Sequence, residues 1–218
     1  MLKPRTLYVP RQTVVIDART IGYVQYPEFF LRKGLKPKDK TAVMGGDWDR
    51  VLERGLNWSS KYEPPTGVET GMIPLQNYAF YQAARARFID GARWSDTGWF
   101  AWMKATAPAR YETEAAITER LALLDRLFEE ARSGHLATGP ADRPRVNIGR
   151  SGRVAIDDGR HRLVVAAVAG VASLEVALSF VHPEADPNPA VAQVIGANPA
   201  PLHPLRRVLG RLYQPKPR

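Results

Sequence analysis

The sequence contains no cysteine, which excludes disulfide bonds, thiolate zinc sites and a thiol nucleophile. It has no apolar run of the roughly 18 to 20 residues that a membrane-spanning helix needs. The first residues, MLKPRTLYVPRQ, lack the apolar segment of a secretory signal. No metal-ligand spacing relates the four histidines, and neither a Ser-His-Asp order nor a Walker-type glycine loop is found. We therefore expect a cytoplasmic protein with no membrane span and no bound zinc.

The chain is basic, but its charge is concentrated at the two ends. Of 218 residues, 44% are hydrophobic and 24% are charged, which is typical of a globular protein. The net charge is +9, of which residues 1–40 carry +6 and residues 202–218 carry +5, so the region between them is nearly neutral. A nucleic-acid-binding protein more often has a basic stripe across its folded core. We favour solvated basic ends, with binding to nucleic acid, anionic lipid or an acidic partner as the alternative.

The middle of the chain has helical periodicity. A first helix is predicted over about 75–90, and a second follows Ser95, a suitable N-cap. The clearest helix covers 113–133, where a threonine can cap the start and a glycine follows the end. Its apolar stripe consists of Ile117, Leu121, Leu124, Phe128 and Ala131. This region also contains Trp94, Trp99 and Trp102. We interpret them as core residues, and the alternative is a platform on which bases stack.

Strand periodicity is found on both sides of this helical region. Short strands are predicted at 13–16 and 40–44, whereas 23–40 and 55–76 are interpreted as loop and connector. Towards the C-terminus, two short apolar segments flank a four-residue loop with two glycines, which predicts a β-hairpin over 145–156. A buried helix and a strand at 174–182 follow. The prediction is an α+β fold with a ββαβ unit.

The most unusual stretch is DDGRHRL at 157–163, at the point where a predicted strand ends and the buried helix begins. The first turn of a helix has backbone N–H groups without intrahelical acceptors and the positive end of the helix dipole. Arg160, His161 and Arg162 add positive charge there, and Gly159 allows close approach of the backbone, which together suit a phosphate or carboxylate. Two carboxylates, Asp157 and Asp158, precede the glycine. They can orient the arginines, cap the helix or hold a divalent cation beside a polyphosphate. The alternative is an ordinary helix cap with an Asp157–Arg162 ion pair.

The segment VNIGRSGRVAIDDGRHRLVVAAVAGVASLEVALSFVHPE resembles the nucleotide-binding unit of the ParB/sulfiredoxin-like superfamily, which has a hairpin, a Gly-x-[His/Arg/Thr]-Arg turn, a helix and a strand. The segments GGDWD and RFIDGARWSDTGWF also resemble a poorly characterised branch with a helical insertion. The resemblance implies a small mixed sheet with helices, in which residues 1–182 form one domain. The helical insertion then covers about 75–134, the ββαβ unit 145–182, and a proline-rich basic tail 183–218.

In this superfamily the turn typically binds nucleotide phosphates: CTP in ParB proteins, ATP in sulfiredoxins and an adenine nucleotide in related free-serine kinases. Gly159 matches the glycine of the turn, Arg162 its final arginine and His161 the histidine of the sulfiredoxin box Gly-Cys-His-Arg. Arg160 stands where sulfiredoxins have cysteine, so sulfiredoxin chemistry is excluded. The ParB box Gly-Glu-Arg-Arg differs at its two middle positions, and no helix-turn-helix is expected after the unit. The kinase box shares Asp158-Gly159 and the final arginine but differs between them.

Four further residues are candidates for the same site. Asp47 and Asp49 flank Trp48 and can hold Mg²⁺ or act as a general base, or they form only a turn around a buried tryptophan. Asn147 and Arg150 lie on or near the hairpin and either contact the ligand or are exposed turn residues.

The leading hypothesis is a nucleotide-binding protein that uses the 158–162 turn for phosphates, with small-molecule phosphotransfer or nucleotide hydrolysis as its chemistry. It implies ATP or another nucleotide as cofactor, with Mg²⁺, and a small-molecule acceptor as partner. Asp47, Asp49 and Asp157 would then handle metal or proton transfer. The alternatives are a nucleic-acid-associated module that uses the basic ends and a regulatory protein that binds a nucleotide without turnover.

Overall fold

The computed structural model describes residues 6–26, 40–56, 70–106, 113–136, 139 and 143–185. Within these residues the strands form one 8-stranded mixed sheet, with the order β1-β4-β8-β6-β7-β3-β5 and with β2 paired to β8. The strands are β1 (Thr6–Pro10), β2 (Thr13–Ile16), β3 (Ile21–Tyr26), β4 (Lys40–Met44), β5 (Gly71–Pro74), β6 (Arg145–Ile148), β7 (Val154–Asp158) and β8 (Leu174–Val181). The predicted α+β class is confirmed. The basic stretch 202–218 and all of the predicted tail beyond Ala185 lie outside the described residues.

The hairpin predicted around Gly149 and Gly152 is present. β6 and β7 pair antiparallel, and the Gly149 N–H donates to the Arg153 carbonyl at 2.9 Å across the turn. β7 also pairs parallel to β3, and β6 pairs parallel to β8. α5 (Arg160–Ala169) connects β7 to β8 and ends at Gly170, whose φ is 74°. The turn at 157–162 is therefore attached to a strand in the interior of the sheet.

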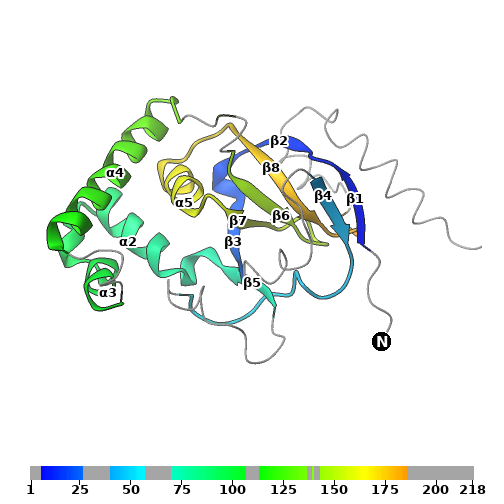
Figure 1. Ribbon diagram of the computed structural model, residues 1–218, viewed down its shortest axis with the longest axis horizontal. Coiled ribbons are helices and arrows are strands. Elements are labelled where there is room, and N and C mark those ends of the chain that lie inside the picture. Colours follow the sequence, from blue (N-terminus) through cyan, green and yellow to red (C-terminus); the bar gives the residue numbers. More distant parts are fainter. Residues whose placement is uncertain are drawn as a thin grey trace, which may run out of the picture.

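A helical layer covers the side of α5 that faces away from the sheet (Figure 1). It is formed by α2 (Ala79–Phe88), α3 (Gly98–Thr106) and α4 (Glu114–Arg132). Both α2 and α4 contact α5. The helix that follows the 157–162 turn thus lies between the sheet and the helices of the middle region.

α4 has the amphipathic face that its periodicity predicts. The Thr113 hydroxyl accepts a hydrogen bond from the Ala116 N–H at 3.2 Å, and Gly134, directly after the last turn, has a φ of 75°. All five residues of the predicted stripe are buried. Burial of one large apolar side chain contributes about 1.5–3 kcal/mol. The stripe therefore helps to attach the helical layer to the rest of the fold.

The predicted cap of the preceding helix is wrong. Ser95 lies within the short 3₁₀ helix Trp94–Asp96, and α3 begins only at Gly98. The hydroxyl of Thr97, the residue directly before α3, accepts from the Phe100 N–H at 3.4 Å. Serine and threonine cap helices by the same hydrogen bond, so local sequence alone did not distinguish the two positions.

Three strands are absent from the prediction: β1, β3 and β5. Part of the segment interpreted as loop, 23–26, belongs to β3, and the end of the predicted connector, 71–74, is β5. The two strands pair with each other. Neither has the alternation of polar and apolar residues that marks a strand with one solvated face, because both are buried to a large extent.

The sheet has two buried faces. The face towards α5 contributes Val146, Ile148, Val154 and Ile156 to the main core, together with Leu163 of α5. The opposite face carries a smaller cluster, formed by Ala42, Met44, Trp48, Met72, Ala155 and Phe180. Because side chains alternate along a strand, Asn147 and Asp157 point to this second face. No helix in the described ranges is long and apolar enough to cross a membrane.

Candidate functional site

The 157–162 turn has the strand-to-helix geometry expected from the sequence. β7 ends at Asp158, and α5 begins at Arg160. Gly159 between them is the N-cap, with a φ of 73° and no side-chain cap hydrogen bond. This left-handed conformation favours glycine over other residues. The turn therefore brings three consecutive basic residues to the start of a helix that no side chain caps at this position.

Asp158 is bound to its neighbouring strand. One carboxylate oxygen accepts from the Gly159 N–H at 2.9 Å, and the other accepts from the Arg145 guanidinium of β6. Arg145 stands opposite Asp158 in the hairpin register. Sequence reasoning missed this arginine, although a cross-strand pair of opposite charge near the open end of a predicted hairpin is a recognisable signal.

The space next to Gly159 is filled by Pro144. A Cβ built on Gly159 would lie 2.8 Å from the Pro144 Cβ and 3.0 Å from its Cα. The absence of a side chain at Gly159 therefore allows Pro144 of the same chain, rather than a ligand, to pack against its Cα.

The three basic residues of the turn have different environments. Arg160 is buried, with its guanidinium carbon 5.9 Å from the centre of the Tyr78 ring. His161 lies 3.2 Å from Arg120 of α4, measured between Nδ1 and Nη2, and its ring packs edge-on against Phe80 at 5.0 Å. Arg162 is half-buried. The helical layer thus contacts this turn directly through Phe80 and Arg120, which sequence reasoning did not identify.

The tryptophans belong mainly to the core of the helical layer. Trp94 and Trp99 are buried, which confirms the core interpretation for both. Trp99 stacks on Trp102 with 5.0 Å between ring centres, and Phe80 joins Trp99 to His161. The cluster therefore packs against the 157–162 turn through His161.

Asp157 points away from the side of the sheet that α5 covers. It is fully buried, and its Oδ2 accepts a hydrogen bond of 2.6 Å from the Ser179 hydroxyl of β8. This hydrogen bond connects β7 to β8 across β6, which lies between them in the sheet.

Asp47, Asp49 and Arg150 form one ion-pair cluster. Asp49, whose side chain is only 2% exposed, accepts from the Arg150 backbone N–H at 2.6 Å, from Nε at 3.1 Å and from Nη2 at 2.8 Å. The same Nη2 donates to the exposed Asp47 at 2.9 Å and to the Gly46 carbonyl at 2.7 Å. Burial alone would raise the pKa of the Asp49 carboxyl, but the hydrogen bonds of Arg150, with His182 and the arginine charge, lower it below its ordinary value. The cluster therefore connects the 46–49 loop to the hairpin turn through hydrogen bonds and ion pairs.

Asn147 is a buried part of the fold. Its Nδ2 donates to the Gln25 side chain at 3.2 Å, and its Oδ1 accepts from the Phe180 N–H at 3.1 Å. Gln25 in turn donates to the carbonyls of Trp48 and Gly71 at 3.1 and 2.8 Å. This pair of amides joins β3, β6 and β8 inside the sheet, so Asn147 is not an exposed turn residue.

The predicted site residues fall into two separate groups. The 157–162 turn lies at the open end of the β6–β7 hairpin, and Arg150 with its two aspartates lies at the closed end. The four residue steps of β7 from Val154 to Asp158 span about 13 Å. The 157–162 turn and the carboxylates of Asp47 and Asp49 therefore do not form one site.

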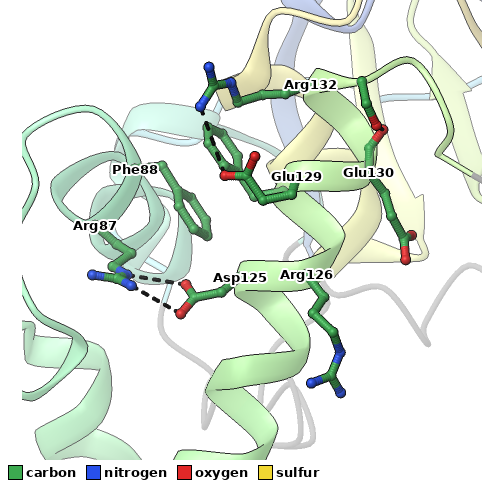
Figure 2. A pocket seen from close by; sticks show the side chains of 9 residues that line it. Arg87, Phe88, Asp125, Arg126, Glu129, Glu130 and Arg132 are labelled. Atoms are coloured by element: carbon green, nitrogen blue, oxygen red, sulfur yellow. Dashed lines mark hydrogen bonds and ion pairs between the residues drawn. The ribbon is translucent and has the colours of Figure 1, made fainter.

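A groove with a volume of about 830 Å³ lies on the helical layer (Figure 2). Phe88 and Phe128 stack in it with 4.0 Å between ring centres. On its rim Arg87 pairs with Asp125 at 3.0 Å, and Arg132 reaches Glu129 at 3.8 Å. None of the residues 157–162 lines it. Two of the arginines drawn in Figure 2, Arg87 and Arg132, are thus each paired with an acidic side chain of the groove.

In the part of the chain that the structure describes, no three His, Asp or Glu side chains are grouped so as to hold a metal ion. Comparisons with protein-family models, curated proteins and solved structures found no match to this chain.

Proposed function

We propose that the protein binds the phosphates of a nucleotide at the turn Asp158–Arg162. The observation that carries this proposal is the start of α5: a ten-residue helix that begins after a left-handed glycine, without a side-chain cap, with Arg160, His161 and Arg162 in its first turn. Helix N-termini of this kind favour anions through their N–H groups and dipole, and arginine adds bidentate hydrogen bonds. The resemblance of this turn to the ParB/sulfiredoxin-like box supports ATP or a related nucleotide, with Mg²⁺.

In this proposal the binding of a nucleotide does not require Asp47 or Asp49. Both belong to the cluster at the other end of the hairpin. Asp157 is the remaining carboxylate suggested for chemistry, and it is directed to the opposite face of the sheet, towards Ser179. Phosphotransfer to a small-molecule acceptor or nucleotide hydrolysis would rest on Asp157 alone.

Isothermal titration calorimetry with ATP, ADP, CTP and GTP, each with and without Mg²⁺, tests the proposal. We expect one of them to bind and Arg162→Ala to weaken its binding by roughly tenfold to hundredfold, because a hydrogen-bonded charge is lost. Arg85→Ala, which removes an exposed arginine of α2, is the matched control and should leave the affinity unchanged. Absence of binding to all four, or equal affinity of Arg162→Ala and wild type, would refute it.

A regulatory protein that binds a nucleotide without turnover is the second candidate. The separation of Asp47 and Asp49 from the turn favours it, because a general base must come within hydrogen-bond reach of the group that it deprotonates. Product analysis after incubation with the nucleotide that binds distinguishes the two: hydrolysis or transfer supports the enzyme, and an intact nucleotide supports the regulatory protein.

A further inference from the structure

α4 and α5 are in contact through the side chains of Arg120 and His161. Arg120 Nη2 lies 3.2 Å from His161 Nδ1. A guanidinium has only donors, so the imidazole nitrogen must accept this hydrogen bond. This contact favours a neutral His161 ring with its proton on Nε2.

The surroundings of His161 agree with a neutral ring. The small cavity beside it is lined by apolar side chains of α3 and α4 and by Arg120, without any acidic residue. From α2 the ring is contacted by Phe80. On its own helix the adjacent charges are Arg160 and Arg162, and the carboxylate of Asp158, directly before the helix, is paired with Arg145. A second proton would place another cation among three arginines and at the positive end of the helix dipole.

We propose that Arg120 is a positioning residue of the phosphate-binding turn. It holds His161 as a neutral ring turned towards the helical layer, so that Arg160 and Arg162 supply the positive charge of the turn. The helical middle region is then part of the nucleotide site, although it lies far from the turn in sequence. This inference rests on the proposed nucleotide binding.

The state of His161 is measured without any ligand. Two-dimensional ¹⁵N–¹H NMR of the histidine rings distinguishes the two neutral tautomers from the imidazolium, and His161→Gln identifies the signal of this ring. In the wild type we expect an unprotonated Nδ1 and a protonated Nε2. Arg120→Ala should change this pattern, whereas Arg126→Ala, which removes an exposed arginine of the same helix, should not.

The role in binding is measured by calorimetry on the same variants, with the nucleotide that binds wild type. Arg120→Ala should weaken binding by about five- to twentyfold, within the usual range of coupling between sites. Arg120→Lys keeps a cationic donor and should recover most of the affinity. Because Arg120 acts through His161, the double variant Arg120→Ala/His161→Gln should bind no more weakly than His161→Gln alone. Circular dichroism verifies that each variant is folded.

The possible outcomes separate the two proposals. If wild type binds no nucleotide, the proposed function is wrong, and the NMR pattern still decides whether Arg120 sets the tautomer. If wild type binds and Arg120→Ala binds as tightly as Arg126→Ala, the positioning role is wrong while the proposed function stands. Additive losses in the double variant, or an Nδ1 that carries a proton in wild type, also overturn the positioning role.

Discussion

Replacing Asp49 with asparagine tests whether the 46–49 loop serves the fold. Asparagine has nearly the same shape and keeps one acceptor oxygen, but it removes the charge that faces Arg150 at 2.8 Å. Breaking a buried pair by neutralising one partner costs about 3–5 kcal/mol. The Arg150 side chain is 40% exposed, so water compensates part of this loss, and we expect a decrease of about 2–3 kcal/mol in the free energy of unfolding. For a chain of this size that lowers Tm by about 4–12 °C.

Asp47→Asn is the matched control, because Asp47 pairs with the same arginine but its side chain is 82% exposed. An exposed ion pair contributes about 1 kcal/mol or less. Thermal and urea unfolding, followed by circular dichroism, measures both variants against wild type. The reasoning is refuted if Asp47→Asn destabilises the protein as much as Asp49→Asn, or if Asp49→Asn leaves Tm unchanged.

Three further predictions follow from other contacts. Because the pKa of Asp49 is lowered in the folded state, its stabilisation is complete above the unfolded carboxyl value of about 4 and is lost as pH falls below it, so urea titrations of wild type and Asp49→Asn should converge in acid. Gly159→Ala should lower the free energy of unfolding by about 2–4 kcal/mol and Gly170→Ala by only about 1–2 kcal/mol. Both glycines have positive φ, but only a Cβ on Gly159 would meet Pro144, at 2.8 Å from its Cβ. Equal losses in the same unfolding assay would contradict this. Asp125→Ala removes the acceptor of Arg87 at 3.0 Å and of Trp94 at 2.9 Å and should cost about 1–3 kcal/mol, whereas Glu129→Ala, on the exposed rim, should leave Tm nearly unchanged.

The local elements of the fold could be predicted from the sequence because their signals are local. The stripe of α4, the glycines of the hairpin and Gly170 after α5 each act within a few residues, and the structure has them in place. β3 and β5 could not be predicted in this way. Gln25 of β3 is polar and yet buried, because its amide bonds to Asn147 and to carbonyls far away in sequence. Such a residue contradicts the alternation of polar and apolar positions on which strand prediction depends.

The candidate site could be predicted only as far as its backbone. The strand-to-helix turn around Gly159 follows from glycine and the flanking periodicities, whereas the partners of its side chains come from other elements. Arg145, Arg120 and Phe80 reach the turn from β6, α4 and α2. Their positions depend on the register of the sheet and on how the helices pack, neither of which a single sequence states.

The length of the β6–β7 hairpin constrains the chemistry that the proposed nucleotide site can support. About 13 Å separates its two ends, whereas a general base acts within about 3 Å of the atom that it deprotonates. A phosphate held at Arg162 is therefore out of reach of Asp49, whose carboxylate is in any case occupied by four hydrogen bonds from Arg150. Asp157 is close in sequence but directed to the other face of the sheet, where Ser179 binds it. Under the proposed function, binding thus depends on the start of α5 and on the helical layer that packs against it. Turnover would need either a movement that brings Asp157 to the ligand or an acceptor that carries its own base.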